Sequence, residues 1–307
     1  METIKWAVNE MPETDDRHLS IMALDEIKKA RTFHESFPQY SKTPLARLDQ
    51  MAGYLGLNSI YVKDESYRFG LNAFKVLGGS FSMARYIAKE TGKKVEDLPY
   101  NVLTSEALKK EFGQATFFTA TDGNHGRGVA WAANKLGQKA VVFMPKGSTQ
   151  TRLRNILAEN AQATIEEVNY DECVRMAAAA AKETPHGVVV QDTAWDGYEE
   201  IPSWIMQGYG TMAMEADEQL SEDGCGRLPM CSSRPASDLW PEQSRATLPT
   251  AIRKTRRKLS WSKPNLPHAS TKVPQKKTEA SRSWTVICRP SWPGLPAGNR
   301  IPSPGIS

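Results

Sequence analysis

Residues 59–79 read SIYVKDESYRFGLNAFKVLGG, and this stretch decides the fold class. Residues 59–63 form an apolar run with β-branched members, which predicts a β-strand. A polar turn follows, and the residues from Asn72 to Glu90 predict a helix that the glycines at positions 78 and 79 interrupt. A strand that leads through a turn into a helix is the building unit of an α/β fold.

The alternation of strand and helix continues over most of the chain. Further strands are predicted at residues 115–119, 140–144, 163–168 and 187–191, and further helices at residues 128–136, 149–159, 171–183 and 202–221. Because short apolar strands alternate with helices, the sequence predicts a mostly parallel sheet with helices on both faces. In such folds ligands bind beyond the carboxyl ends of the strands. The segments that directly follow the predicted strands are therefore the candidate site.

The first candidate segment places Lys75 in the first turn of a predicted helix, between Phe74 and Val76. Taken alone, such a lysine has an ordinary interpretation as a surface residue of an amphipathic helix. The functional interpretation is a lysine that forms a Schiff base. The positive end of the helix dipole and the apolar neighbours are expected to lower the pKa of its amine, which makes the amine a nucleophile toward an aldehyde.

Two further segments follow predicted strands. Residues 121–128 read TDGNHGRG, and their three glycines allow backbone N–H groups to approach an anion closely. Asn124 offers an amide to a bound polar group, while Asp122 has an ordinary interpretation as a helix N-cap. Residues 191–198 read QDTAWDGY, in which Asp192 is either a cap or a carboxylate of the site.

Together the three segments resemble the fold-type II pyridoxal-phosphate enzymes, the tryptophan synthase β-like group. This resemblance implies a two-domain α/β fold in which Lys75 holds pyridoxal 5′-phosphate and Asn124 contacts the phenolic oxygen of that cofactor. It also implies that the substrate is bound by the loop residues Thr121, Asp122, Gly123 and His125.

Within that group the sequence is most similar to the diaminopropionate ammonia-lyase family. The similar segments are residues 43–45, 63–79, 121–131, 144–147, 191–198 and 201–209. The implied activity is the α,β-elimination of 2,3-diaminopropionate to pyruvate and two ammonia. Asp122 would favour this diamine by charge pairing and would take the Cα proton from the face opposite Lys75, while Asp192 would bind or protonate the leaving amine. A serine/threonine dehydratase-like lyase is the alternative.

The resemblance and the composition together divide the chain into three parts. A partial large domain is expected to comprise residues 1–80 and 186–226, and a small α/β domain is expected to comprise residues 81–185. Residues 227–307 form a tail with 15 of the 39 Lys and Arg, 3 of the 35 Asp and Glu, 12 of the 19 Pro, and no Phe or Tyr. A segment of this composition is expected to be disordered.

The tail also lacks a feature that the resemblance requires. Fold-type II enzymes hold the cofactor phosphate with a second glycine-rich loop at a helix N-terminus, yet residues 227–240 contain no glycine. When the codons are read one nucleotide earlier, residues 230–246 permit an apolar strand followed by a glycine-rich loop. We therefore expect the tail to be an out-of-frame translation and this chain to be impaired or inactive. The alternative is a real tail that binds nucleic acid through the basic residues 253–258.

Composition excludes several other classes of protein. The sequence has no apolar run long enough to span a membrane and no apolar leader near Met1, so we expect neither a membrane protein nor a secreted one. Four cysteines without a CxxC pair predict neither a zinc site nor a disulfide framework, and they fit a cytoplasmic protein. The expected partner is a small amino-acid substrate rather than a nucleic acid or a metal, and the resemblance implies a homodimer.

Overall fold

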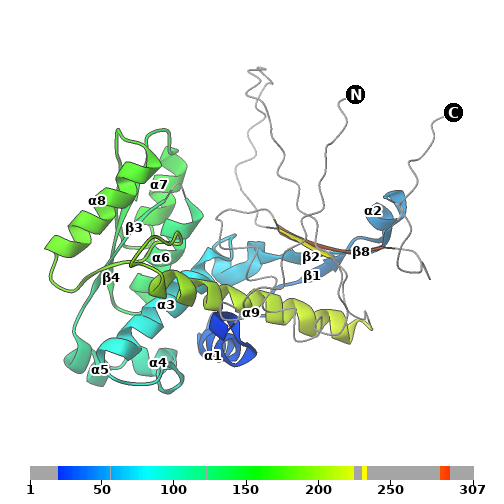
Figure 1. The fold of residues 1–307 in the computed structure, drawn as a ribbon, viewed down its shortest axis with the longest axis horizontal. Helices are drawn as coiled ribbons and strands as arrows, with labels where there is room; N and C mark the ends of the chain where they lie inside the picture. The colour runs from blue at the N-terminus through cyan, green and yellow to red at the C-terminus, as the bar shows by residue number, and fades with distance from the viewer. Residues whose placement is uncertain (1–19, 56, 122, 225–229, 234–283, 291–307) are drawn as a thin grey trace.

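The computed structural model describes residues 20–55, 57–121 and 123–224 together with two strands of the tail, 230–233 and 284–290 (Figure 1). In chain order its elements are α1 (Leu24–Glu35), β1 (Leu45–Arg47), α2 (Asp49–Tyr54), β2 (Leu57–Asp64), the 3-10 helix η2 (Glu65–Gly70), α3 (Lys75–Glu90), the 3-10 helix η3 (Val95–Asp97), α4 (Tyr100–Leu103), α5 (Glu106–Phe112), β3 (Thr116–Ala120), α6 (Asn124–Lys135), β4 (Lys139–Met144), α7 (Gln150–Leu157), β5 (Gln162–Ile165), α8 (Tyr170–Glu183), β6 (Gly187–Val189), α9 (Glu200–Glu222), β7 (Met230–Ser233) and β8 (Trp284–Pro290).

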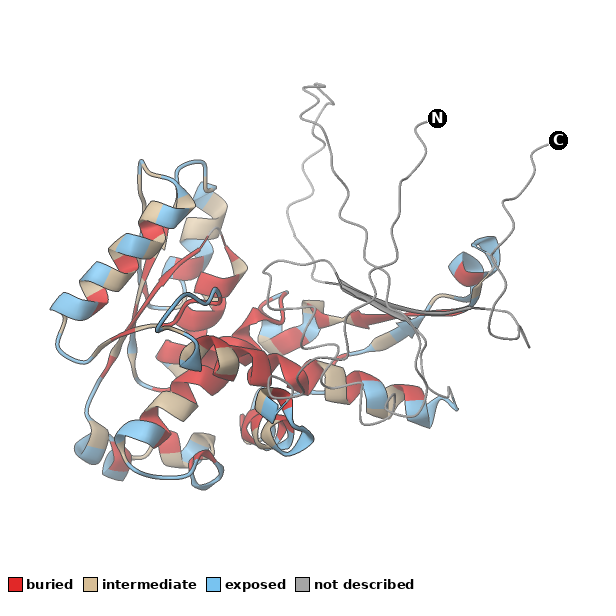
Figure 2. Cartoon of the chain, viewed as in Figure 1, coloured by how far each residue is buried: buried red, intermediate tan, exposed pale blue. Residues whose placement is uncertain are grey.

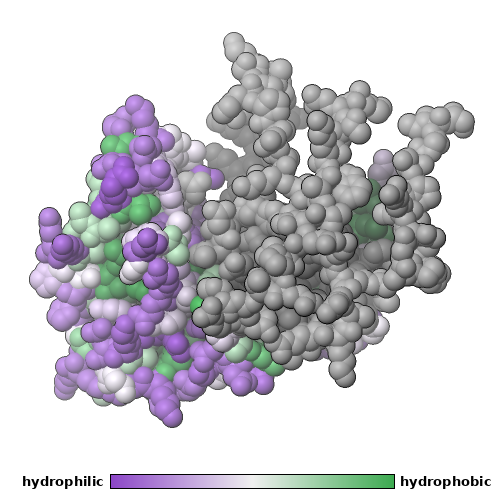
Figure 3. Space-filling view, in the orientation of Figure 1, coloured by the Kyte–Doolittle hydropathy of each residue, from purple (hydrophilic) through white to green (hydrophobic). Residues whose placement is uncertain are grey.

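A four-stranded sheet with the order β5-β4-β3-β6 is parallel throughout. Its side chains alternate between two apolar layers because successive residues of a strand point to opposite faces. Phe118 and Phe143 pack with Ala177 of α8, whereas Phe117 and Val142 belong to the core that includes helix α6. The prediction of a parallel sheet covered on both faces is confirmed here. The visible face over α7 and α8 is mostly hydrophilic, as expected for helices that turn one side to solvent (Figure 3).

The second sheet has the order β1-β2-β8-β7, and all its pairs are antiparallel. Strand β2 pairs with β1 on one side and with β8 of the tail on the other. Two segments of the tail, 230–233 and 284–290, are therefore strands, which differs from the expectation of a tail without regular structure. The other tail residues lie outside the described part of the chain.

Helices α3, α6 and α9 meet where glycines allow their backbones to approach. A Cβ atom added to Gly208 of α9 would lie 2.4 Å from the carbonyl oxygen of Leu77, and one added to Gly128 of α6 would lie 2.8 Å from the backbone nitrogen of Val76. Figure 2 shows that these central helices are the most completely buried part of the chain. The packing brings the first turn of α6 against the first turn of α3, which begins with Lys75.

Three boundaries differ from the sequence prediction. Helix α3 begins at Lys75 rather than at Asn72, because Asn72 has a left-handed φ of 58°. Helix α6 begins at Asn124 rather than at residue 128. Strand β6, which we assigned to the large domain, forms its hydrogen bonds with β3 of the parallel sheet, so it continues that sheet.

Among the described helices, none is both long enough and apolar enough to cross a membrane.

Candidate active site

The centre of the candidate site is a buried ion pair between two of the predicted residues. Lys75 is the first residue of α3, and Asp192 follows strand β6. The ammonium of Lys75 donates to Oδ2 of Asp192 at 2.6 Å, and the two side chains are 8% and 9% exposed. The rings of Phe74 and Tyr209 lie close to the same ammonium, with their centroids 5.6 and 5.4 Å from Nζ. The predicted lysine therefore has apolar neighbours, but its amine also has a carboxylate partner.

His125 approaches this ion pair from the first turn of α6. Its Nε2 lies 2.9 Å from the carbonyl oxygen of Val190, and because a carbonyl only accepts hydrogen bonds, Nε2 carries the proton. Burial lowers the pKa of His125, and the ammonium of Lys75 acts in the same direction, while Asp192 opposes them. Burial therefore disfavours the charged form of the imidazole, while Nδ1 lies 3.7 Å from Oδ2 of Asp192, the carboxylate that favours that form.

Asp192 remains ionised in spite of its burial. Burial acts to raise the pKa of this carboxyl, but His125 and the hydrogen-bonded ammonium of Lys75 lower it to about 2. The site thus contains a carboxylate that is prepared to hold a cation, and in this structure the cation is Lys75.

The loop between β3 and α6 lies beside this group. Thr121 is buried, and its hydroxyl accepts a hydrogen bond from the backbone nitrogen of Gly123 at 2.9 Å. Gly123 is the residue before the helix, and Asn124 is the first helical residue and is partly exposed. A Cβ atom on Gly123 would lie 3.2 Å from Cδ of Arg152, so the side chain of Arg152 would have to shift slightly to admit a larger residue here. Asp122 lies outside the described residues.

Sequence reasoning missed two further residues near the site. Gln191 accepts hydrogen bonds from the hydroxyl of Thr119 and the backbone nitrogen of Ala120 at 3.0 and 2.9 Å, and it donates to the hydroxyl of Tyr170 at 2.6 Å. Gln191 therefore joins the carboxyl end of β3 to the start of α8. Because Gln191 directly precedes Asp192, these hydrogen bonds also hold the backbone next to Asp192 in place. Its place directly after a predicted strand was a usable signal, whereas no motif marked Tyr170.

The side chains present fit a bound polar aromatic group. Within the described part of the chain, the buried atoms His125 Nδ1 and the Tyr209 hydroxyl have no hydrogen-bond partner, and both belong to residues that surround Lys75 or its carboxylate. Buried polar atoms without a partner are rare in folded proteins. A primary amine, a carboxylate and two open hydrogen-bonding positions match the needs of an aldehyde cofactor and an amino-acid substrate.

A comparison with protein families decides which cofactor this is. The profile described as "Pyridoxal-phosphate dependent enzyme" matches residues 37–225, which is more than half of the chain. The chain belongs to this family. The prediction of a fold-type II pyridoxal-phosphate enzyme is therefore confirmed for the fold and for the cofactor.

The chain can also be compared with individual members of the pyridoxal-phosphate dependent family. Diaminopropionate ammonia-lyase of Salmonella typhimurium is 53% identical over 190 residues, which are 62% of this chain and 47% of that protein. The protein of the same name from Escherichia coli strain K12 is 49% identical over 206 residues, 66% of this chain and 50% of that protein. The crystal structure of the Escherichia coli enzyme in complex with D-serine has a TM-score of 0.66 at 46% identity and covers 72% of this chain and 55% of that one. The chain thus spans about half the length of these relatives.

The Lys75–Asp192 pair predicts how the stability of this pyridoxal-phosphate enzyme depends on pH. A carboxyl whose pKa is lowered by folding stabilises the chain above its unfolded pKa near 4, and this contribution is lost as the pH falls toward 2. The difference in unfolding free energy between the unsubstituted chain and Asp192→Asn should therefore shrink by about 1 kcal/mol between pH 5 and pH 3. Urea unfolding at each pH measures it.

The matched control is Asp196→Asn, an exposed carboxylate in the same loop. It removes a carboxylate from the same loop without breaking the buried ion pair, so it measures the effect of losing a negative charge there. An Asp192→Asn difference that stays constant over this pH range would mean that the ion pair does not stabilise the folded chain.

Proposed function

We propose that this chain has the active site of a diaminopropionate ammonia-lyase, which converts 2,3-diaminopropionate to pyruvate and two ammonia by α,β-elimination. The observation that supports this most directly is the buried Lys75–Asp192 ion pair at the carboxyl end of β6, because it pairs an amine with a carboxylate that holds cations. The identities of 53% and 49% with relatives of that name support the same activity.

In this proposal Lys75 holds the cofactor and removes the Cα proton from one face of the substrate. Pyridoxal phosphate, when bound, supplies the electron sink for the electrons that this proton leaves behind. Asn124 contacts the cofactor, and the loop residues Thr121, Gly123 and His125 bind the substrate. Burial of Lys75 and its neighbours excludes water from the reacting atoms.

Asp192 was given two possible roles, binding the leaving amine or protonating it. A carboxyl with a pKa of about 2 is ionised at neutral pH, and an ionised carboxylate binds an ammonium group but has no proton to give. The structure therefore favours the binding role. In the proposed reaction, Asp192 holds the second ammonium of the diamine at the position where it now holds the ammonium of Lys75.

Asp122 is proposed to favour the diamine and to serve as the base on the second face. We expect Asp122→Asn, in a protein whose C-terminal half follows the family sequence, to lower turnover of one enantiomer of diaminopropionate about a hundredfold more than that of the other. The reason is that one face loses its base while Lys75 still serves the opposite face. Pyruvate release from each pure enantiomer measures the effect.

Asp196→Asn is the control for this experiment, because Asp196 is an exposed carboxylate. Equal losses for both enantiomers would rule out the division of the two faces and leave Asp122 with a binding role. A protein that prefers serine or threonine to the diamine would instead indicate the dehydratase-like alternative.

The assembly, the location and the intactness of the chain are also proposals. The proposed homodimer rests on the resemblance to the family, the proposed cytoplasmic location rests on the cysteine pattern, and the relatives support a small amino acid as substrate. The interpretation of residues 227–307 as an out-of-frame tail is supported by the absence of glycine from residues 227–240. In this proposal the chain as it stands binds its cofactor poorly.

A further inference from the structure

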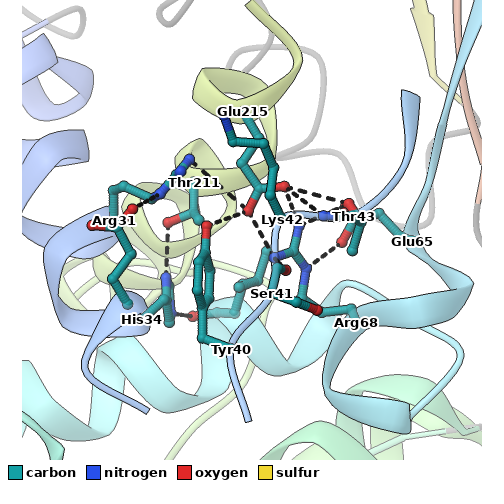
Figure 4. Close-up of polar contacts among 12 residues, drawn as sticks. Arg31, His34, Tyr40, Ser41, Lys42, Thr43, Glu65, Arg68, Thr211 and Glu215 are labelled. Atoms are coloured by element: carbon teal, nitrogen blue, oxygen red, sulfur yellow. Dashed lines mark hydrogen bonds and ion pairs between the residues drawn. The ribbon is translucent and has the colours of Figure 1, made fainter. Parts of the chain in front are cut away.

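A second buried cluster of charged side chains lies where α9 crosses β2, and Figure 4 shows it in close-up. Its central residue is Glu215 of α9, and we name the cluster the Glu215 network. Glu215 accepts hydrogen bonds or ion pairs at 2.7 to 3.3 Å from Tyr40, Thr43, Lys63 and Arg68. The proposed activity uses none of these residues.

Arg68 is the residue that connects this network to the chain around it. Its guanidinium binds Glu215 through two hydrogen bonds of 2.7 and 2.8 Å and binds Glu65 through two more of 2.8 Å each. The side chain is 1% exposed. Burial acts to raise the pKa of Glu215, but Arg68 and Lys63 lower it to about 2, so the carboxylate stays charged. Arg68 and Lys63 thus face Glu65 and Glu215, and the buried guanidinium of Arg31 also lies 3.9 Å from Glu215.

The segment from Arg68 to Lys75 has an unusual backbone. Phe69, Gly70 and Asn72 have left-handed φ angles of 49°, 73° and 58°. For residues other than glycine this conformation is unfavourable, and it persists only where the surroundings hold it. The four charge-assisted hydrogen bonds of Arg68 hold the beginning of the segment, and helix α3 holds its end.

The same segment also contacts α6, which carries His125. The centroid of the Phe69 ring lies 4.9 Å from the ring centroid of Trp131 and 6.3 Å from that of Tyr40. The carbonyl oxygen of Leu71 accepts a hydrogen bond from Arg127 at 3.3 Å. The segment is therefore fixed between the Glu215 network on one side and the helix of the candidate site on the other.

We propose that Arg68 is a positioning residue for Lys75: by anchoring the strained segment 69–74 to Glu215 and Glu65, it sets where the first residue of α3 presents its amine. This inference rests on the proposed role of Lys75 in holding the cofactor. The alternative is a purely structural role of the Glu215 network. In that case each buried residue of the network would affect Lys75 only by stabilising the folded chain.

Lys63 provides the matched comparison because it belongs to the same network. It is fully buried and lies 2.7 Å from Glu215, but it sits on β2 and does not belong to the strained segment. If the network acts only through stability, Lys63→Met and Arg68→Met should change the reactivity of Lys75 to the same degree once stability is matched. If Arg68 positions Lys75, only the second substitution should change it.

The experiment uses the full 307-residue chain and pyridoxal as the probe, because pyridoxal has the reactive aldehyde but needs no phosphate-binding loop. The chain is mixed with pyridoxal, borohydride fixes the probe to each lysine that it has reached, and mass spectrometry of peptides compares labelling of Lys75 with that of Lys28. Lys28, whose side chain is 54% exposed, is the internal standard for surface lysines. Thermal unfolding of each variant sets a temperature at which all are folded to the same extent.

We expect the ratio of Lys75 to Lys28 labelling to fall about tenfold or more in Arg68→Met and to change less than about twofold in Lys63→Met. Arg68→Lys keeps the charge but loses the paired hydrogen bonds, so it should lie between them, and it replaces Arg68→Met if that variant does not fold. Adding Asn72→Gly, which removes strain at an exposed position, should restore part of the ratio.

Equal ratios in Arg68→Met and Lys63→Met, with Lys75 clearly labelled in the unsubstituted chain, would overturn the positioning role and leave the proposed function intact. If Lys75 of the unsubstituted chain is labelled no better than Lys28, the proposed role of Lys75 fails, and the positioning role fails with it.

Discussion

Replacing Lys75 by alanine should abolish the visible absorption band of lysine-bound pyridoxal phosphate in a protein whose C-terminal half follows the family sequence. The amine of Lys75 has a carboxylate, an imidazole and an unpartnered phenol close to it, and no other lysine described in the structure contacts Asp192. Turnover should fall with the band, because the same amine is proposed to remove the Cα proton. An absorption spectrum of the purified protein with excess cofactor measures the change.

Lys63→Met is the control, because it removes a second buried lysine that is not part of the site. The band should persist in that variant. A band that survives in Lys75→Ala would show that a different lysine holds the cofactor, and the assignment of the site would have to be revised.

The sequence was sufficient to predict most of the regular structure around this lysine. Strands β3, β4 and β6 are short apolar runs, and each was predicted within one or two residues of its observed bounds because burial on both faces demands such runs. The starts of α3 and α6 were misplaced. Each start is set by the backbone conformation of a residue before the helix, namely Asn72 with its left-handed φ before α3 and Gly123 with its extended φ before α6. These conformations cannot be predicted from residue composition.

The site was predicted in part. Lys75, His125 and Asp192 each followed a predicted strand, so the sequence nominated them separately, but their contact depends on how closely α3, α6 and α9 pack at Gly128 and Gly208. That packing brings together residues that are far apart in the chain. The hydrophobic periodicity of a single segment cannot predict such a contact.

The Glu215 network could not be predicted for a different reason. Glu65 and Arg68 lie in a stretch that reads as an exposed polar turn, and Lys63 ends the strand before it, where a charged side chain is expected at the surface. Only Glu215 on α9 joins them into a buried cluster of paired charges. The turn that the sequence indicated is present, but the side chains of Glu65 and Arg68 point inward.

Replacing residues 227–307 by the translation of the alternate reading frame should raise turnover of diaminopropionate by at least about a hundredfold over the 307-residue chain, because a phosphate-binding loop would be regained. Residues 227–240 contain no glycine, whereas the alternate frame permits a glycine-rich loop directly after an apolar strand. Tryptophan has a single codon, so the pairs Trp284–Thr285 and Trp292–Pro293 force Asp and Ala in that frame, as the family sequence requires. Pyruvate release by the two pure proteins measures the difference.

The control for this prediction is the restored protein with Lys75→Ala, which should lose the gain while keeping the new C-terminal half. Reading the gene between about codons 223 and 230 provides an independent test, since a single slip must leave a one-base deletion or a two-base insertion there. Early stop codons in the alternate frame, or turnover by the 307-residue chain equal to that of the restored protein, would show that the tail is a real extension. In that case strand β8, which pairs along β2, would be part of the working fold rather than a consequence of the slip.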